Sequence, residues 1–125
     1  MTQTPTPEEE FAPLVALAAG EVITHALPND VRLADGRTLV LVTLDNGVER
    51  PNTFGPRGLL ELRGVLAEVA RRAAAGEVAA VAVTGKPAMF AAGADVTAPI
   101  PPDDAAAALL PRLGHETFSM LHSCG

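Results

Sequence analysis

The segment GKPAMFAAGAD, residues 85–95, offers chemistry that would rest on backbone groups instead of side chains. It follows a run of small apolar residues and contains two glycines and four alanines. Small residues let a ligand approach the main chain closely, so that backbone N–H groups can stabilise negative charge on a ligand oxygen. A tight turn in which small residues only permit close packing is the alternative explanation.

Two phosphate-binding patterns are excluded for this segment. A P-loop requires Ser or Thr directly after its lysine, and Pro87 follows Lys86 here. The Gly-x-Gly-x-x-Gly pattern of dinucleotide-binding proteins does not follow a predicted strand either. The segment therefore favours neither a nucleotide phosphate loop nor a Rossmann fingerprint.

Side-chain chemistry has few candidates in this sequence. The possible metal ligands and nucleophiles are His25, His115, His122, Cys124, Ser119 and Ser123. We interpret the histidines as surface or capping residues, and the serines and the cysteine as ordinary polar positions, because none stands in a recognisable ligand or nucleophile motif. The acidic residues are scattered, so no general acid and base pair can be identified among them.

Composition and charge indicate one small soluble domain. The chain has 125 residues, of which 48% are hydrophobic, and its four phenylalanines are its only aromatic residues. A net charge of −6 argues against nucleic acid as a partner. No apolar stretch reaches the roughly 18 residues of a membrane span, and the first residues do not resemble a signal peptide. With a single cysteine, these features predict a cytoplasmic protein that does not bind a membrane.

The amino-terminal part divides into a tail and a strand-rich region. Residues 1–20 begin with alternating Thr and Pro and three acidic residues, which predicts a flexible acidic tail. Residues 21–125 are predicted to form the folded domain. Within 21–44, apolar runs predict antiparallel strands, and Pro28-Asn29-Asp30 and Asp35-Gly36 are predicted turns. A polar loop follows at residues 45–53, where α/β proteins often bind ligands.

The rest of the chain alternates helix and strand. Apolar residues recur at helical spacing from Pro56, and Gly76 suits the position after the helix end. Residues 78–83 are apolar on both faces, which is typical of a parallel strand covered by helices. A later helix is predicted over 103–122, with an interruption at Pro111. The fold class is therefore α/β, with a strand–helix–strand unit.

Three segments of this sequence together resemble the crotonase superfamily of enoyl-CoA hydratases and isomerases. They are RPNTFGPRGLLELRGVL, VAAVAVTG and MFAAGAD, in that order. The resemblance covers residues 39–121, and its most specific parts are Asn52-Thr53-Phe54 and Ala92 to Asp95. The segments GEVITHAL, LVTLDNG and PNTFGPRGL extend it. They look most like the amino-terminal hydratase part of bacterial multifunctional fatty-acid oxidation proteins, which continue into a 3-hydroxyacyl-CoA dehydrogenase.

The resemblance implies the amino-terminal half of a ββα spiral that binds an acyl-CoA. Ala94 matches a backbone N–H donor to the enolate oxygen and is the implied catalytic residue. The implied substrate-binding residues are Arg50, Pro51, Thr53, Ala92, Gly93 and Asp95. Arg50 could attract CoA phosphates or could form a solvated ion pair with Glu49, and both explanations stay open. No separate cofactor is implied, since coenzyme A is part of the substrate, and a homo-oligomer is expected for the complete protein.

The sequence also departs from the family. The second oxyanion donor, in a Gly-Gly-Gly motif after a further strand, and the catalytic glutamates that follow it are not in this sequence, and Glu116 stands in another context. We therefore expect a truncated half-domain. It would be either part of a lyase that adds water to 2-enoyl-CoA in fatty-acid β-oxidation, or of an isomerase, or else a non-catalytic remnant that binds CoA weakly or not at all.

Overall fold

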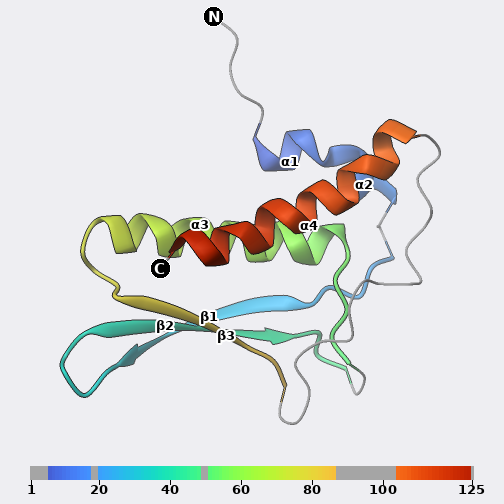
Figure 1. The fold of residues 1–125 in the computed structure, drawn as a ribbon. Coiled ribbons are helices and arrows are strands. Elements are labelled where there is room, and N and C mark those ends of the chain that lie inside the picture. Colours follow the sequence, from blue (N-terminus) through green and yellow to red (C-terminus); the bar gives the residue numbers. More distant parts are fainter. Residues whose placement is uncertain (1–5, 18–19, 49–50, 87–103, 125) are drawn as a thin grey trace, which may run out of the picture.

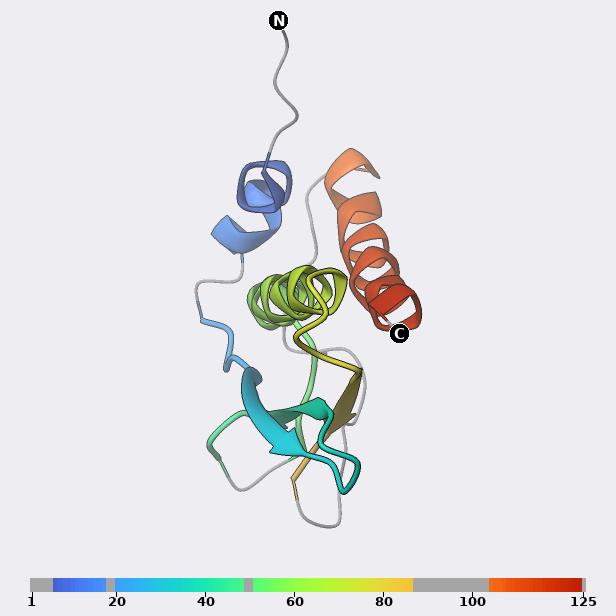
Figure 2. The ribbon, with the colours of Figure 1, turned by 90° about the vertical axis from the view of Figure 1, so that its left-hand side faces the viewer.

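The computed structural model describes residues 6–17, 20–48, 51–86 and 104–124, with only the backbone described at 104–108, 110 and 122–124. Its helices and strands are α1 (Pro7–Glu10), α2 (Ala12–Leu17), β1 (His25–Arg32), β2 (Thr38–Asp45), α3 (Pro56–Ala74), β3 (Ala80–Thr84) and α4 (Asp104–Cys124). The sheet order is β1-β2-β3, and all the described helices lie on one side of the sheet (Figures 1 and 2). The predicted α/β class is confirmed by this combination of helices and a three-stranded sheet.

Strands β1 and β2 form the predicted antiparallel hairpin. Their register runs from His25 opposite Asp45 to Arg32 opposite Thr38. Gly36, with a φ of +89°, supplies the left-handed position of the connecting turn. The predicted turn at 28–30 is wrong, because these residues lie inside β1. β1 is an edge strand, and an edge tolerates Pro28 since one row of its backbone groups does not pair with another strand of the described sheet.

The strand–helix–strand unit is confirmed. β2 and β3 are parallel, with Leu39 opposite Ala80 and Thr43 opposite Thr84. Helix α3 connects them, begins at Pro56, and is followed by Gly76 with a φ of +79°. Its apolar face packs on the sheet because Leu62, Leu66 and Val69 recur at helical spacing. The buried core between these elements consists of Ala26, Val40, Val42, Leu44, Leu62, Leu66, Val69 and Val78.

The amino-terminal segment differs from the flexible tail that we predicted for residues 1–20. Residues 7–17 form α1 and α2, and the Thr6 hydroxyl accepts a hydrogen bond from the Glu9 N–H at 3.2 Å. Phe11 is fully buried in a second cluster with Leu14, Leu59 and Leu113. One large aromatic residue therefore anchors this acidic segment on α3 and α4, and burial of its ring offsets the entropy of ordering.

Helix α4 is continuous, whereas we predicted an interruption at Pro111. A proline inside a helix removes one hydrogen bond, and the packing of α4 on α3 compensates for that loss. Leu113 is fully buried two residues later. Arg63 of α3 donates a hydrogen bond to Glu116 at 2.6 Å, so the two helices are also joined by an ion pair.

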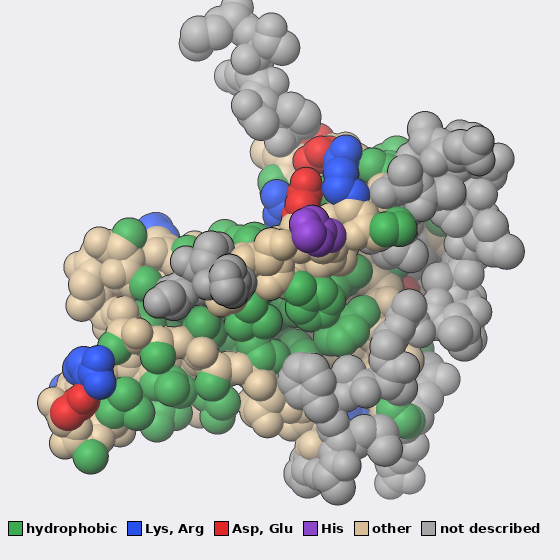
Figure 3. Space-filling view, viewed as in Figure 1, with side chains coloured by type: hydrophobic (Ala, Val, Ile, Leu, Met, Phe, Trp, Pro, Cys, Tyr) green, Lys and Arg blue, Asp and Glu red, His purple; other side chains and the backbone are tan. Residues whose placement is uncertain are grey.

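The sheet face opposite the helices is uncharged over its described centre. Side chains alternate along strands, so the positions that share this face follow from the buried positions and the register. They are Leu27, Asn29, Val31, Leu39, Leu41, Thr43, Ala80, Ala82 and Thr84. Leu27 is 51% exposed and Val31 is 38% exposed. In the space-filling view, hydrophobic side chains gather over the hairpin below the helices (Figure 3).

Candidate functional site at the ends of β2 and β3

The parallel pairing of β2 and β3 brings two loops to the same edge of the sheet. One loop follows Asp45 at the end of β2, and the other begins at Gly85 after β3. Ligands in open α/β sheets bind at the carboxyl ends of the strands, where the loops and not the sheet supply the contacts. This edge is therefore where the structure would place a ligand.

The loop after β2 is held by two buried asparagines. The Asn52 side-chain amide donates to the Leu44 carbonyl at 2.7 Å, and its oxygen accepts from the Asn46 N–H at 3.0 Å. The Asn46 side-chain amide donates to the Pro51 carbonyl at 3.2 Å, and its oxygen accepts from the Val48 N–H at 3.2 Å. Asn52 is fully buried. The backbone on both sides of residues 49–50 is therefore fixed to the end of β2.

Lys86 joins this loop to the end of β3. Its ammonium group donates to the Asn46 side-chain oxygen and to the Val48 carbonyl. An oxygen of the Asp45 carboxylate lies 3.8 Å from the ammonium nitrogen, and the Lys86 side chain is only 19% exposed. Sequence reasoning considered Lys86 only as a P-loop lysine and missed this role. The signal available in the sequence was a single lysine just after the predicted strand at 78–83, together with the Asp45-Asn46 pair at the end of the preceding strand.

The amino-terminal end of α3 is occupied by a carboxylate from another part of the chain. Glu21 accepts hydrogen bonds from the Arg57 and Gly58 N–H groups, both at 2.9 Å. The helix's own preceding residue, Gly55, offers no side-chain cap, and a Cβ there would lie 2.5 Å from the Glu21 side chain. The positive end of the helix dipole is thus satisfied within the protein and does not need an external anion.

Of the predicted site residues, the structure describes Pro51 and Thr53. Both are half-buried, and both offer their carbonyls to the protein itself. Asn46 donates to Pro51, and the Thr24 hydroxyl donates to the Thr53 carbonyl at 2.7 Å. The other predicted site residues lie outside the described residues, and their roles stay predictions. They are Arg50, Ala92, Gly93, Ala94 and Asp95.

The histidines occupy separate places in the structure. His25 lies 3.0 Å from a carboxylate oxygen of Glu61, and His115 is exposed on α4. The side chains of His122 and Cys124 are outside the description. Among the side chains that the structure does describe, no group of three or more histidine, cysteine or acidic residues could hold a metal ion.

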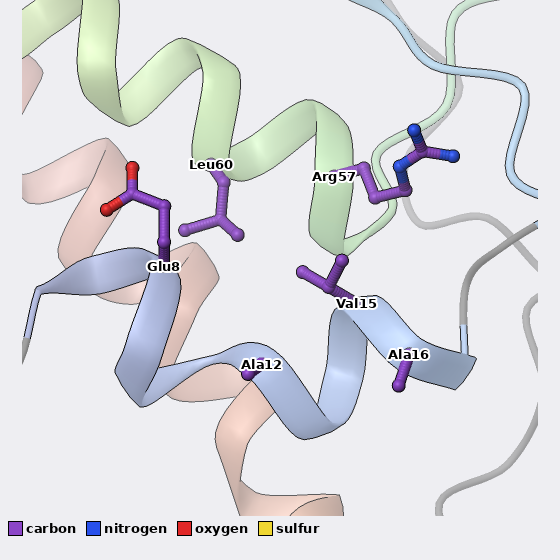
Figure 4. A pocket seen from close by; sticks show the side chains of 6 residues that line it. All are labelled: Glu8, Ala12, Val15, Ala16, Arg57 and Leu60. Atoms are coloured by element: carbon purple, nitrogen blue, oxygen red, sulfur yellow. The ribbon is translucent and has the colours of Figure 1, made fainter.

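One open cavity of about 420 Å³ lies away from the strand ends, between the amino-terminal helices and α3. Figure 4 shows its apolar wall, made by side chains of α2 and α3, and the Arg57 side chain, which extends away from it. The residues around it are Glu8, Ala12, Val15, Ala16, Arg57 and Leu60. Of the predicted site residues that the structure describes, neither Pro51 nor Thr53 lines this cavity.

Comparison with known proteins gives one fold likeness. No family model and no curated protein matches the chain. The solved structure of DspI from Pseudomonas aeruginosa is similar, with 27% sequence identity and a TM-score of 0.56. The likeness covers 78% of this chain and 37% of that chain, so the present chain spans less than two fifths of the DspI structure. Within residues 6–17, 20–48, 51–86 and 104–124, no helix has the length and apolar character needed to cross a membrane.

Proposed function

We propose that this chain forms the acyl-CoA-binding, amino-terminal half of a crotonase-type ββα spiral. The observation that supports it best is the parallel pairing of β2 and β3. Because of this pairing, the loop after β2, which contains Pro51 and Thr53, begins at the same edge of the sheet as the chain after β3. Lys86, just after β3, bonds to the loop after β2. The two most specific parts of the resemblance, Asn52-Thr53-Phe54 and Ala92 to Asp95, follow β2 and β3 in the sequence.

The proposal assigns a role to each motif. The loop at 50–53 borders the CoA part of the ligand, where Arg50 attracts the phosphates. Ala92, Gly93 and Asp95 line the same ligand, with the Ala92 backbone beside the adenine. The Ala94 N–H donates to the thioester oxygen, which gains negative charge when the substrate becomes enolate-like, and a donor aimed at developing charge lowers the barrier. The reaction class is the hydration or isomerisation of an enoyl-CoA in fatty-acid β-oxidation.

Binding without turnover is the activity expected of this chain by itself. The second oxyanion donor and the catalytic glutamates that the resemblance requires are not in this sequence. Each missing group costs a factor of about 10² or more in rate. The second candidate function is therefore a non-catalytic CoA-binding module, favoured by that sequence observation. A cytoplasmic location and a homo-oligomeric complete protein belong to the proposal as well.

Calorimetric titration with butyryl-CoA tests the proposal. This saturated thioester carries every group that the site would bind but has no double bond to react. We expect saturable binding to one site per chain, and Arg50→Ala should weaken it about tenfold, the value of one charge-assisted hydrogen bond. The matched control is Arg37→Ala, since Arg37 lies in the hairpin turn and pairs with Asp35.

Two results would count against the proposal. One is an absence of saturable binding by the unaltered chain. The other is an equal loss of affinity in the Arg50→Ala and Arg37→Ala variants, which would indicate a general charge effect. Hydration of crotonyl-CoA at a rate above the buffer rate would instead show that the chain is catalytic by itself, and so would exclude the non-catalytic module.

A further inference from the structure

We propose that Lys86 is a positioning residue that holds the loop after β2 in the shape required to bind CoA. The ligand in this inference rests on the proposed function, whereas the contact itself is a feature of the structure. Lys86 is the only lysine in the sequence, and it stands three residues before the MFAAGAD segment of the resemblance.

The ammonium group is partly withdrawn from solvent, and its surroundings account for this. A cation that loses hydration needs hydrogen-bond acceptors and negative charge nearby. Lys86 has the Asn46 side-chain oxygen, the Val48 carbonyl and the Asp45 carboxylate around it. All three acceptors belong to the end of β2 and the loop that follows it. These contacts tie the chain that leaves β3 to the end of β2 and its loop.

The contact acts on the predicted ligand loop through Asn46. The Asn46 side chain also donates to the Pro51 carbonyl and accepts from the Val48 N–H. Holding this side chain in place therefore holds the backbone before and after residue 50. Asn46 and Lys86 are 40 positions apart in the sequence. Without the ammonium group, this backbone would lose the contacts that join it to the residue after β3. A ligand would then have to order the loop when it binds, and affinity would fall.

Positioning and direct phosphate contact predict different results with and without ligand. A lysine that touches phosphate would matter less as phosphates are removed from the ligand, and its effect would shrink at high salt. Its removal would leave the free loop as ordered as before. A lysine that orders the loop would change the order of the free loop, and would affect every ligand that the loop contacts. Dephospho-CoA lacks only the 3′-phosphate of CoA, whereas pantetheine lacks the adenosine and all the phosphates.

The test uses Lys86→Met, which keeps side-chain length without the charge, and Lys86→Arg, which keeps donors and charge. Arg37→Met at the far end of the sheet is the control, and circular dichroism verifies that each variant is folded. We expect Lys86→Met to weaken the binding of CoA and dephospho-CoA about tenfold and that of pantetheine by less, and Lys86→Arg to recover part of the loss. Without ligand, the Gly47 and Val48 amides should exchange with solvent at least tenfold faster in Lys86→Met than in the control.

Unchanged amide exchange in a folded Lys86→Met variant would overturn the positioning role, whatever the ligand does. A loss of affinity for CoA together with unchanged amide exchange would favour direct phosphate contact instead. If the unaltered chain binds none of the three probes, the proposed function fails and the CoA part of this inference fails with it. The exchange measurement then decides separately whether Lys86 holds the loop.

Discussion

At the residue scale, Asn52 shows how a motif position can serve the fold and the site together. It belongs to the most specific part of the sequence resemblance, and its side chain is fully buried. Its amide donates to the Leu44 carbonyl of β2 and accepts from the Asn46 N–H of the loop that follows. Asn52 thus determines where the predicted ligand residues on either side of it lie.

Replacing Asn52 by leucine, which is similar in size, should destabilise the protein by about 2–4 kcal/mol. The change leaves the Leu44 carbonyl and the Asn46 N–H without their side-chain partner. A buried polar group that loses its hydrogen bond lowers the free energy of unfolding by about 1–3 kcal/mol. Urea denaturation measures the difference. Asn29→Ala, on the exposed edge strand, is the control and should change stability by less than about 0.5 kcal/mol. Equal effects of the two substitutions would contradict the structural role of Asn52.

The ion pair between Asp30 of β1 and Arg72 of α3 should make stability depend on pH in the acid range. Hydrogen bonds from Arg72 at 3.0 and 2.7 Å lower the pKa of the Asp30 carboxyl below its ordinary value of 3.8. Because the folded-state pKa is depressed, the contribution is fully present above the unfolded pKa and is lost as the pH falls through the folded value.

Denaturation of the unaltered chain and of Asp30→Asn, compared from pH 7 to pH 2, measures this effect. The difference between the two should be largest above about pH 4 and should disappear in the acid. Added salt should reduce it at every pH, because both side chains reach solvent. Arg72→Gln should show the same pH profile as Asp30→Asn. A difference that persists at pH 2 would mean that Asp30 acts by a route other than its charge.

At the element scale, the helix α3 was predictable and the amino-terminal helices were not. The 3.6-residue period of Leu59, Leu62 and Leu66 indicates a buried helix face without any tertiary information. The acidic and proline-rich composition of residues 1–10 gives no sign of the role of Phe11, which lies between α1 and α2 and whose partners Arg63 and Arg112 lie far along the chain. The two guanidinium carbons lie 5.8 and 5.1 Å from the ring centre, a contact that no local pattern predicts.

Two glycines of α3 should respond in opposite directions to replacement by alanine. A Cβ at Gly64 meets open space, so Gly64→Ala should stabilise the protein by about 0.5–1 kcal/mol through helix propensity. A Cβ at Gly58 would lie 3.2 Å from the Thr24 carbonyl and 3.4 Å from the Glu21 carboxylate. That crowding should cancel the gain and weaken the Glu21 cap, so Gly58→Ala should be the less stable variant by at least about 1 kcal/mol.

Thermal unfolding of the two variants, monitored by circular dichroism, decides this comparison. The pair is well matched, because both substitutions lie in the same helix and add the same methyl group. If both variants gain the same stability, the close packing of α3 against residues 21–24 is looser than the structure describes.

At the scale of the whole molecule, the parallel β2–β3 unit explains which part of the candidate site could be predicted. Strand–helix–strand periodicity is enough to place the loops after 45 and 85 at one edge. The contact of Lys86 with Asn46 was not predictable, because side chains 40 positions apart meet only once the strand register is set. A register shift of one residue would turn Asp45 and its neighbours to the other face.

The uncharged sheet face should cause the isolated chain to self-associate. Leu27 and Val31 are exposed there, and no described helix covers this side of the sheet (Figure 2). Two molecules of net charge −6 repel each other except where they meet through uncharged surface. Sedimentation equilibrium should show a molar mass that rises with concentration, and Leu27→Glu should restore a monomer.

Ala67→Glu, at an exposed position of α3, controls for the added charge and should leave the association unchanged. A chain that stays monomeric at millimolar concentration would show that this face does not mediate self-association. The same conclusion would follow if the two glutamate variants behaved alike.

The Glu21 cap on α3 has a consequence for the order of folding. The N–H groups in the first turn of α3 donate to Glu21, a residue 36 to 37 positions earlier, and the helix lacks a side-chain cap of its own. Closing so long a segment costs entropy before the contact is gained, so the start of α3 should consolidate late, after the hairpin has docked. Glu21→Ala should then accelerate unfolding and leave the refolding rate nearly unchanged in stopped-flow measurements. A matching fall in the refolding rate would place the cap in the folding nucleus instead, and the loop that precedes α3 would then be set at the beginning of folding.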